Sequence, residues 1–162
     1  MRFVSNLAEK EFEQMEGIKI KISQELDQIE FNLVKQMLIE EFPNQKVFFS
    51  GEQSTSPDSV FVVAKHPTKA KVVGFCSVHL YVRVSGICTA IIEDVVVPKR
   101  YKRKKIGSLI INSALRFATA RANKVILQAS PENTKFYESC GFNEYDNLIT
   151  FTKYPQRVIS NA

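Results

Sequence analysis

The spacing of hydrophobic residues divides the first part of the chain into a strand and a helix. Residues 18–22 (IKIKI) alternate apolar and basic side chains, which is typical of a half-buried strand near a sheet edge. The pattern allows a short helix before this strand but does not require one. From about residue 25 to residue 42, apolar residues recur at helical spacing, with Ser23 or Asp27 as candidate caps. This pattern predicts an amphipathic helix that ends before Pro43.

The middle of the chain has the pattern of buried strands. Residues 60–64 (VFVVA) form an apolar run, and the polar residues 66–69 follow it as a turn. Residues 71–83 and 87–97 are rich in β-branched side chains, and Ser85-Gly86 separates them. These two runs predict a long antiparallel hairpin at the centre of a sheet.

The last part of the chain alternates helices and strands. Apolar residues fall on one helical face between residues 106 and 120, after Pro98 has ended the preceding strand. Residues 124–128 predict a short strand, residues 131–139 a short helix and residues 148–154 a last strand.

The predicted order of elements is β-α-β-β-β-α-β-α-β. It combines antiparallel hairpins with later strand–helix–strand units, so we expect an α+β fold with a central mixed sheet flanked by helices. Neither a repeat nor a Pro/Gly/Ser-rich linker divides the 162 residues. We therefore expect a single domain over residues 1–162, although this fold class alone specifies no function.

The composition narrows the class of protein. Hydrophobic residues make up 44% of the chain and charged residues 24%, which is typical of a globular domain. Cys76, Cys88 and Cys140 are odd in number and lack metal-ligand spacing, so we expect neither disulfides nor a metal site. The sequence shows neither a signal peptide's apolar segment nor a run of roughly 18 apolar residues. These observations predict a cytoplasmic protein without a membrane segment.

The net charge of +5 is unevenly spread, because six of the seven residues 99–105 are basic. Such a run can be a solvated face or can bind nucleic acid, an import receptor, an anionic membrane or a phosphorylated ligand. Here it enters a predicted helix at Ile106-Gly107, where unpaired N–H groups and the helix dipole suit phosphates. Tyr101 is its one aromatic residue, and no nucleic-acid recognition motif accompanies it. We therefore expect no nucleic-acid partner.

Three motifs follow one another in the second half of the chain. They are IEDVVV at 92–97, KxxKxG at 102–107 and SPENxxFYxxCGF at 130–142. In order and spacing they resemble the core of GNAT acetyltransferases, and among these most of all the glucosamine 6-phosphate N-acetyltransferases. The resemblance implies the GNAT acyl-CoA N-acyltransferase fold, acetyl-CoA as co-substrate and transfer of its acetyl group to the amine of glucosamine 6-phosphate.

The resemblance also assigns the residues that bind the coenzyme. The pyrophosphate is expected at the basic loop and the start of the helix, and the pantetheine arm is expected to pair with the preceding strand as an added strand would. Lys105 stands where the family usually has glycine, whereas Gly107 is retained. The expected coenzyme-binding residues are Val95, Val96, Val97, Lys102, Arg103, Lys104, Lys105, Ile106, Gly107, Ser108, Asn133 and Tyr137.

Two residues are expected to take part in the chemistry. The resemblance implies that Tyr137 donates a hydrogen bond or proton to the departing thiolate, whose parent thiol has a pKa near 8.5. Glu93, or a backbone carbonyl with water, is expected to accept the proton that the amine loses. Glu93 and Asp94 are expected to contact the amino sugar. Because adjacent strand residues face opposite ways, a bulge is needed for both to face one site.

The acceptor is the least determined part of the hypothesis. Lys124 matches a substrate-binding lysine of the family, and Arg83 or His79 and Lys153 are expected to replace other cations that the family carries. The resemblance also implies a homodimer, in which the strand at 148–154 could pair between subunits. Two alternatives remain. One is a GNAT enzyme for another amine, such as a protein N-terminus, a lysine or a small amine; the other is a noncatalytic acyl-CoA-binding or nucleic-acid-binding module.

Overall fold

A computed structural model describes residues 10–15, 17–43, 52–53 and 55–145. It contains two compact units, residues 1–129 and residues 130–162. The described part of the first unit holds a six-stranded sheet together with the helices α1 and α2. The strands are β1 (Lys10–Met15), β2 (Ile18–Ser23), β3 (Ser59–Lys65), β4 (Val72–Val82), β5 (Cys88–Val96) and β6 (Lys124–Leu127).

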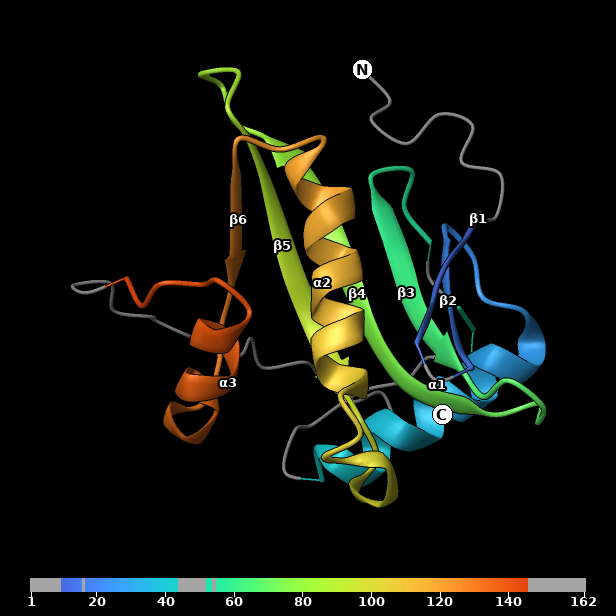
Figure 1. The fold of residues 1–162 in the computed structure, drawn as a ribbon. Helices are drawn as coiled ribbons and strands as arrows, with labels where there is room; N and C mark the ends of the chain where they lie inside the picture. Colours follow the sequence, from blue (N-terminus) through green and yellow to red (C-terminus); the bar gives the residue numbers. More distant parts are fainter. Residues whose placement is uncertain (1–9, 16, 44–51, 54, 146–162) are drawn as a thin grey trace, which may run out of the picture. The chain divides into compact units, whose positions relative to one another are not determined.

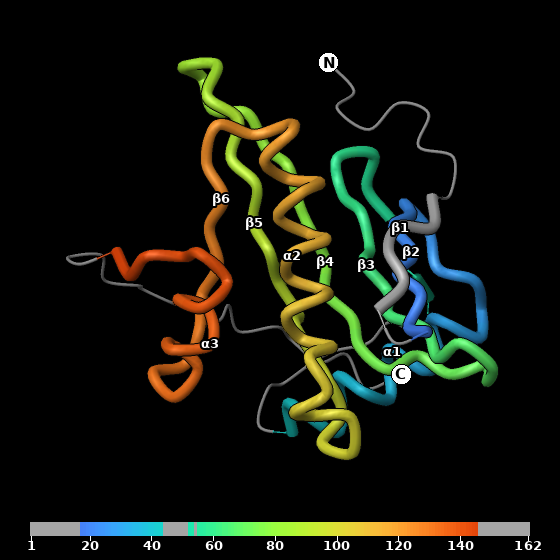
Figure 2. Tube along the Cα trace, viewed as in Figure 1, coloured from blue at the N-terminus to red at the C-terminus, as the bar shows by residue number. Residues whose placement is uncertain are grey.

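The strands lie in the sheet in the order in which they occur in the chain, from β1 to β6. The first four pairs are antiparallel, and β5 and β6 are parallel. A parallel pair needs a crossover, and α2 (Ile106–Thr119) supplies it between β5 and β6, as Figures 1 and 2 show. The predicted mixed sheet with flanking helices is thus confirmed.

Helix α1 (Gln28–Glu41) begins at one of the two predicted caps. The side chain of Asp27 accepts a hydrogen bond from the N–H of Glu30, and the Glu30 carboxylate accepts one from the N–H of Asp27. This capping box satisfies two N–H groups that a helix start otherwise leaves unpaired. The helix begins three residues later than the pattern predicted.

Two further predictions concern the first and the last strand of the chain. A short helix was considered somewhere before residue 18, and residues 10–15 of that part of the chain form the edge strand β1, because pairing with β2 gives this segment a hydrogen-bonding partner. The strand predicted at 148–154 lies outside the described residues.

Helices α1 and α2 cover opposite faces of the sheet. A Cβ atom on Gly74 would lie 2.3 Å from Cδ1 of Ile110 in α2, so the missing side chain allows α2 to approach β4 closely. The next residue, Phe75, packs with Val34 and Met37 of α1. Successive strand residues point to opposite faces, which explains this division of the core.

The described part of the second unit is short. It consists of the 3-10 helix η2 (Pro131–Asn133) and the helix α3 (Thr134–Ser139). The two together occupy the predicted helix at 131–139, and Gly141 follows with a φ of 93°, which is favourable for glycine after a helix. Among the helices in the described residues, none combines the length and apolar composition that crossing a bilayer requires.

Candidate active site

A bulge interrupts the pairing of β4 and β5. Phe75 pairs with Val96 and Ser77 pairs with Glu93, so Cys76 alone lies opposite the two residues between Glu93 and Val96. The first of these, Asp94, has a φ of 54°, a conformation that non-glycine residues seldom adopt. Such a bulge was predicted to be necessary for Glu93 and Asp94 to face one site.

Strand β5 separates from β6 at the bulge. The parallel ladder covers Thr89 to Ile92, and β5 itself continues to Val96. Val96 is buried, whereas Val95 and Val97 are half-buried. The part of β5 beyond Ile92 therefore offers backbone groups to which an extended polar chain can bind as an added strand.

The basic loop places a left-handed residue at the start of α2. Lys105 is the N-cap of α2, has a φ of 60° and forms no side-chain capping bond. Arg103 has a φ of 63°. The first N–H groups of a helix have no intrahelical partner, and the helix dipole adds positive charge there. Backbone and side chains thus make this loop suitable for a pyrophosphate.

Several cations of this loop are held by neighbouring side chains. Nζ of Lys102 lies 2.7 Å from Oε1 of Glu41, at the end of α1. The guanidinium of Arg100 and the ammonium of Lys104 lie 5.1 and 5.9 Å from the centre of the Tyr101 ring. The first contact ties the loop to the end of α1, and the other two lie within the loop itself.

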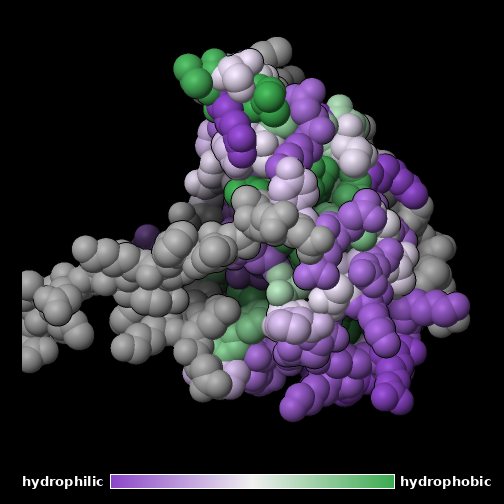
Figure 3. Space-filling view, turned by 90° about the vertical axis from the view of Figure 1, so that its left-hand side faces the viewer, coloured by the Kyte–Doolittle hydropathy of each residue, from purple (hydrophilic) through white to green (hydrophobic). Residues whose placement is uncertain are grey.

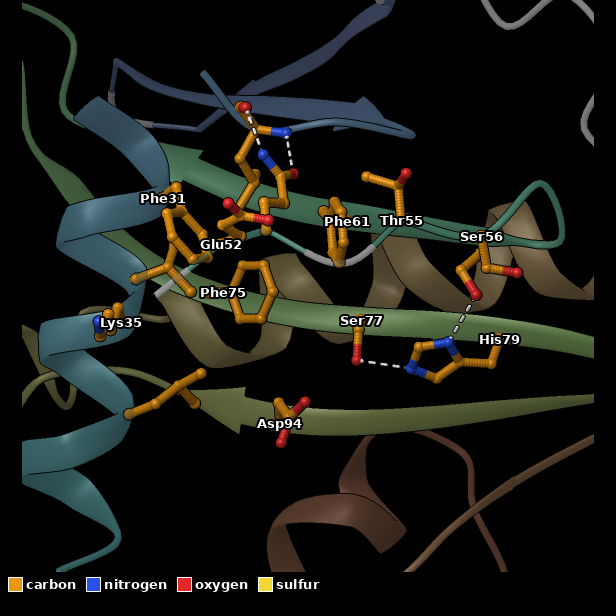
Figure 4. A pocket seen from close by; sticks show the side chains of 15 residues that line it. Phe31, Lys35, Glu52, Thr55, Ser56, Phe61, Phe75, Ser77, His79 and Asp94 are labelled. Atoms are coloured by element: carbon orange, nitrogen blue, oxygen red, sulfur yellow. Dashed lines mark hydrogen bonds between the residues drawn. The ribbon is translucent and has the colours of Figure 1, made fainter. Parts of the chain in front are cut away.

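A cavity of about 400 Å³ lies between α1 and the strands β3, β4 and β5. The phenylalanines Phe31, Phe61 and Phe75 line it near α1, and Ser77 and His79 line it further along β4 (Figure 4). Asp94, at the bulge, completes the polar part. The cavity thus combines an apolar end with a polar end that includes one of the predicted acceptor-binding residues.

His79 is the centre of a hydrogen-bond network at the polar end of the cavity. Its Nδ1 lies 2.7 Å from Oγ of Ser59, and its Nε2 lies 3.0 Å from Oγ of Ser77. Its Nε2 also lies 3.5 Å from Oε2 of Glu93. Glu93 is thus brought to the imidazole, with 58% of its side chain still exposed.

The two predicted acceptor cations Arg83 and Lys124 belong to a separate cluster. The hydrogen bond from Arg83 holds the pKa of Tyr81 below its ordinary value, and the charge of Lys124 acts in the same direction. Lys124 is paired with Thr89, which precedes Glu93 by four strand residues, about 13 Å. The structure therefore separates these cations from Glu93 and Asp94 along the sheet.

In the second unit, Tyr137 lies in α3 and packs against two rings. The ring centres of Phe136 and Phe142 are 5.0 and 6.1 Å from that of Tyr137, both in edge-to-face geometry. Asn133 is the N-cap of α3 and forms no side-chain capping bond. Lys153 lies outside the described residues. The geometry of the second unit thus gives Tyr137 a fixed aromatic setting.

The sequence analysis did not assign Ser59 or Ser77 to the site and mentioned His79 only as a substitute cation. The sequence does contain a signal for Ser77 and His79. They are polar residues two positions apart in an apolar strand, so they face the same side of the sheet. Ser59 could not be found this way, since the pairing of β3 with β4 places it opposite His79.

Hydrophobic side chains gather at the tip of the β4–β5 hairpin (Figure 3). The large exposed hydrophobic residues there are Tyr81, Val82, Val84 and Ile87.

Among the described residues, no group of three or more His, Cys, Asp or Glu side chains is arranged to hold a metal ion.

A bulged strand beside a cavity, a separating neighbour strand and a basic loop before a helix together define an acyl-CoA-dependent transferase. Comparison of the sequence supports this class, because the acetyltransferase (GNAT) domain family matches residues 57–144. The chain belongs to the GNAT acetyltransferase family. GNAT acetyltransferases use acetyl-CoA, and this chain is an acetyl-CoA-dependent N-acetyltransferase.

Three curated relatives carry the name glucosamine 6-phosphate N-acetyltransferase. The protein from Arabidopsis thaliana is 31% identical over 65% of this chain and 72% of its own length. The protein from Schizosaccharomyces pombe is 39% identical over 39% of this chain and 57% of its length. The one from Candida albicans is 43% identical over 33% of this chain and 36% of its length.

Solved structures support the same fold. Glucosamine-6-phosphate N-acetyltransferase from Arabidopsis thaliana has a TM-score of 0.61 at 25% identity, covering 83% of this chain and 97% of that one. An aminoglycoside acetyltransferase from a soil metagenomic sample has a TM-score of 0.72 at 20% identity, covering 87% and 98% of the two chains. The second comparison is a likeness of fold alone.

Proposed function

We propose that this protein transfers the acetyl group of acetyl-CoA directly to the amine of glucosamine 6-phosphate, giving N-acetylglucosamine 6-phosphate for amino-sugar (UDP-GlcNAc) biosynthesis. The observation that carries the proposal is the bulge at Asp94, which places a carboxylate pair beside a cavity. The shared name of the three curated relatives supports the choice of acceptor.

In this proposal the coenzyme is bound along β5 and at the start of α2. Val95, Val96 and Val97 would hold the pantetheine arm through their backbone groups. The segment from Lys102 to Ser108 would hold the pyrophosphate through its N–H groups and cations. Asn133 would add a contact to coenzyme A.

The chemical roles follow from the charges that develop during transfer. An ammonium must lose a proton before its nitrogen can attack the thioester, and Glu93, or a backbone carbonyl with water, would accept that proton as the general base. The departing sulfur becomes negative, and the hydroxyl of Tyr137 would donate a hydrogen bond to it. Arg83 and Lys124, with Lys153, would attract the acceptor's phosphate.

One observation favours a second acceptor class. Phe31, Phe61 and Phe75 line the cavity near α1, and the cations Arg83 and Lys124 are not among its lining residues. An amine that carries an apolar group, such as a protein N-terminus, would bury that group against the three rings. A GNAT acetyltransferase for such an amine is therefore the alternative.

A thiol-release assay separates the two proposals. Acetyl-CoA is offered with glucosamine 6-phosphate, unphosphorylated glucosamine, a lysine peptide or a peptide with an apolar N-terminus. Preferential turnover of glucosamine 6-phosphate is expected. Equal rates with and without the phosphate would contradict the first proposal, and faster turnover of the apolar peptide would establish the second.

We also propose a homodimer and a cytoplasmic location. The exposed hydrophobic side chains at the tip of the β4–β5 hairpin support an association between copies, and the three free cysteines fit a reducing compartment. Sedimentation equilibrium tests the first expectation, with a monomer mass as the contradicting result. Fractionation of cells that express the protein tests the second.

A further inference from the structure

A polar cluster at the cavity wall has a basic group at its centre. His79 projects from β4 with 36% of its side chain exposed, and Ser59 of β3 and Ser77 of β4 contact its two ring nitrogens. Both serines are buried. Burying two hydroxyls costs free energy unless they are paired, and here each hydroxyl pairs with the ring of His79.

The partners of His79 allow the ring to hold either one proton or two. A hydroxyl both donates and accepts, so Ser59 can accept from a protonated Nδ1. Ser77 has two acceptors within reach, because its Oγ lies 3.0 Å from Nε2 of His79 and 3.3 Å from the backbone carbonyl of Glu93. When Ser77 donates to His79, Nε2 is unprotonated. When Ser77 turns to the carbonyl, Nε2 can carry a proton and donate it to Oγ of Ser77.

We propose that His79 is the group that takes the proton from the acceptor ammonium, and that Ser59 positions the ring for this step. The inference rests on the proposed amine acetylation. It revises the role of Glu93, which lies 3.5 Å from Nε2 of His79. In this arrangement Glu93 stabilises the imidazolium by its charge and does not itself accept the proton.

The proton and the electrons balance over one turnover. The ammonium nitrogen gives one proton to Nε2 of His79 as the Ser77 hydroxyl turns to the carbonyl of Glu93. The freed lone pair attacks the thioester carbonyl carbon, a C–N bond forms and the C–S bond breaks. The thiolate receives the second proton that leaves the nitrogen, and the imidazolium returns the first to water. The products are the amide, the thiol of coenzyme A and one proton in solution.

The charged groups around the cavity are mostly carboxylates. Glu93 and Asp94 face it from β5, Glu52 lines the cavity from the loop before β3, and Lys35 lines it from α1. The carboxylate of Glu93 lies 3.5 Å from Nε2 of His79, so its charge can offset that of the imidazolium during the attack.

The test compares the variants His79→Gln and His66→Gln with the unaltered protein. His66 is a matched control, since its ring lies outside the cavity and contacts Thr68. We expect His79→Gln to lower kcat roughly 100-fold with the KM for acetyl-CoA unchanged. The kcat/KM of the unaltered protein should show an acidic limb that belongs to the general base, and His79→Gln should not show this limb. His66→Gln should keep the acidic limb of the pH profile; its ring lines a small pocket with Lys104 and Ile106, so the control is read on the pH profile and not on the KM for acetyl-CoA.

Ser59 supplies a second test that does not depend on His79→Gln folding. Ser59→Ala should lower kcat roughly 10-fold and move the acidic limb of the pH profile, whereas Ser59→Thr, which keeps the hydroxyl, should restore both. Full activity and an unaltered pH profile in either His79→Gln or Ser59→Ala would overturn the inference. An unaltered protein that acetylates none of the amines would instead refute the proposed function, and the inference with it.

Discussion

Oε1 of Glu30 lies 2.8 Å from Nζ of Lys65, although Glu30 is only 2% exposed. Nζ of Lys21 approaches the same carboxylate at 3.1 Å. The first turn of α1 is thereby tied to β2 and β3 by a buried carboxylate between two ammonium groups. Since α1 forms one wall of the cavity, this ion group also fixes the wall.

Glu30→Gln is expected to lower the free energy of unfolding by roughly 3 kcal/mol at neutral pH, because it leaves two ammonium groups near a neutral amide. Glutamine can still accept the hydrogen bond from the N–H of Asp27, so the helix cap is kept. Urea unfolding measures the effect. Glu40→Gln is the control, since Glu40 is exposed on the same helix and should change stability little.

The same carboxylate makes stability depend on pH. Burial raises the pKa of Glu30, but the hydrogen bonds from Lys65, from the Asp27 N–H and from Lys21 lower it more, and the folded value lies below the ordinary 4.5. The unfolded chain therefore binds this proton at a higher pH than the folded one. The stabilisation is present above about pH 4.5 and is lost as the pH falls through the folded pKa. The stability gap to Glu30→Gln should shrink over this range, and a constant gap would contradict the assignment.

Lys105 permits a test of backbone and charge together. Its φ of 60° costs a non-glycine residue roughly 1 kcal/mol, so Lys105→Gly should unfold at a temperature equal to or above that of the unaltered protein. Lys105→Ala keeps the strain and should not gain. Both variants lose a cation and should raise the KM for acetyl-CoA, whereas Lys105→Arg should not. Lower stability of the glycine variant than of the alanine variant would contradict the left-handed conformation.

The contact between Gly74 and α2 predicts a steric effect. Gly74→Ala should destabilise the protein by about 1–3 kcal/mol, because the new methyl group meets Cδ1 of Ile110. Ile110→Val removes that atom, and the double variant should recover part of the loss. Thermal unfolding of the two single variants and the double variant measures the coupling. Purely additive effects would show that the two positions do not meet.

Tyr137→Phe tests the role proposed for the phenol. Its ring should still pack edge to face against Phe136 and Phe142, so thermal stability should change little. We expect kcat to fall roughly 100-fold and the KM for acetyl-CoA to stay the same. Phe136→Leu is the control, because it weakens the packing and leaves the hydroxyl. An unchanged kcat in Tyr137→Phe would remove this residue from the chemistry.

The sheet and α2 could be predicted because their signals are local. Residues 71–83 and 87–97 are β-branched runs around a turn, and they became β4 and β5 almost to the residue. Strand β1 could not be predicted in this way. Phe12 and Met15 are spaced as in a helix, and the segment becomes a strand because it pairs with β2.

The site was predictable as far as single motifs carry it. The sequence indicated Glu93 and Asp94 and stated that a bulge was needed for both to face one site. It could not place that bulge opposite Cys76, because register depends on the partner strand. The network around His79 was hidden for the same reason: Ser59 lies 20 residues away in the chain and meets the ring only through the pairing of β3 with β4.

The order of the strands in the sheet has a consequence for how the protein is made. From β1 to β5, each strand pairs with the strand that the ribosome has just completed, so the antiparallel part can form as the chain emerges. Strands β3 and β6 must each wait for a whole helix, α1 and α2 respectively, before they can pair with the preceding strand. Among the strands that the structure describes, the pair of β5 and β6, beside which we propose that the coenzyme binds, is therefore the last to form.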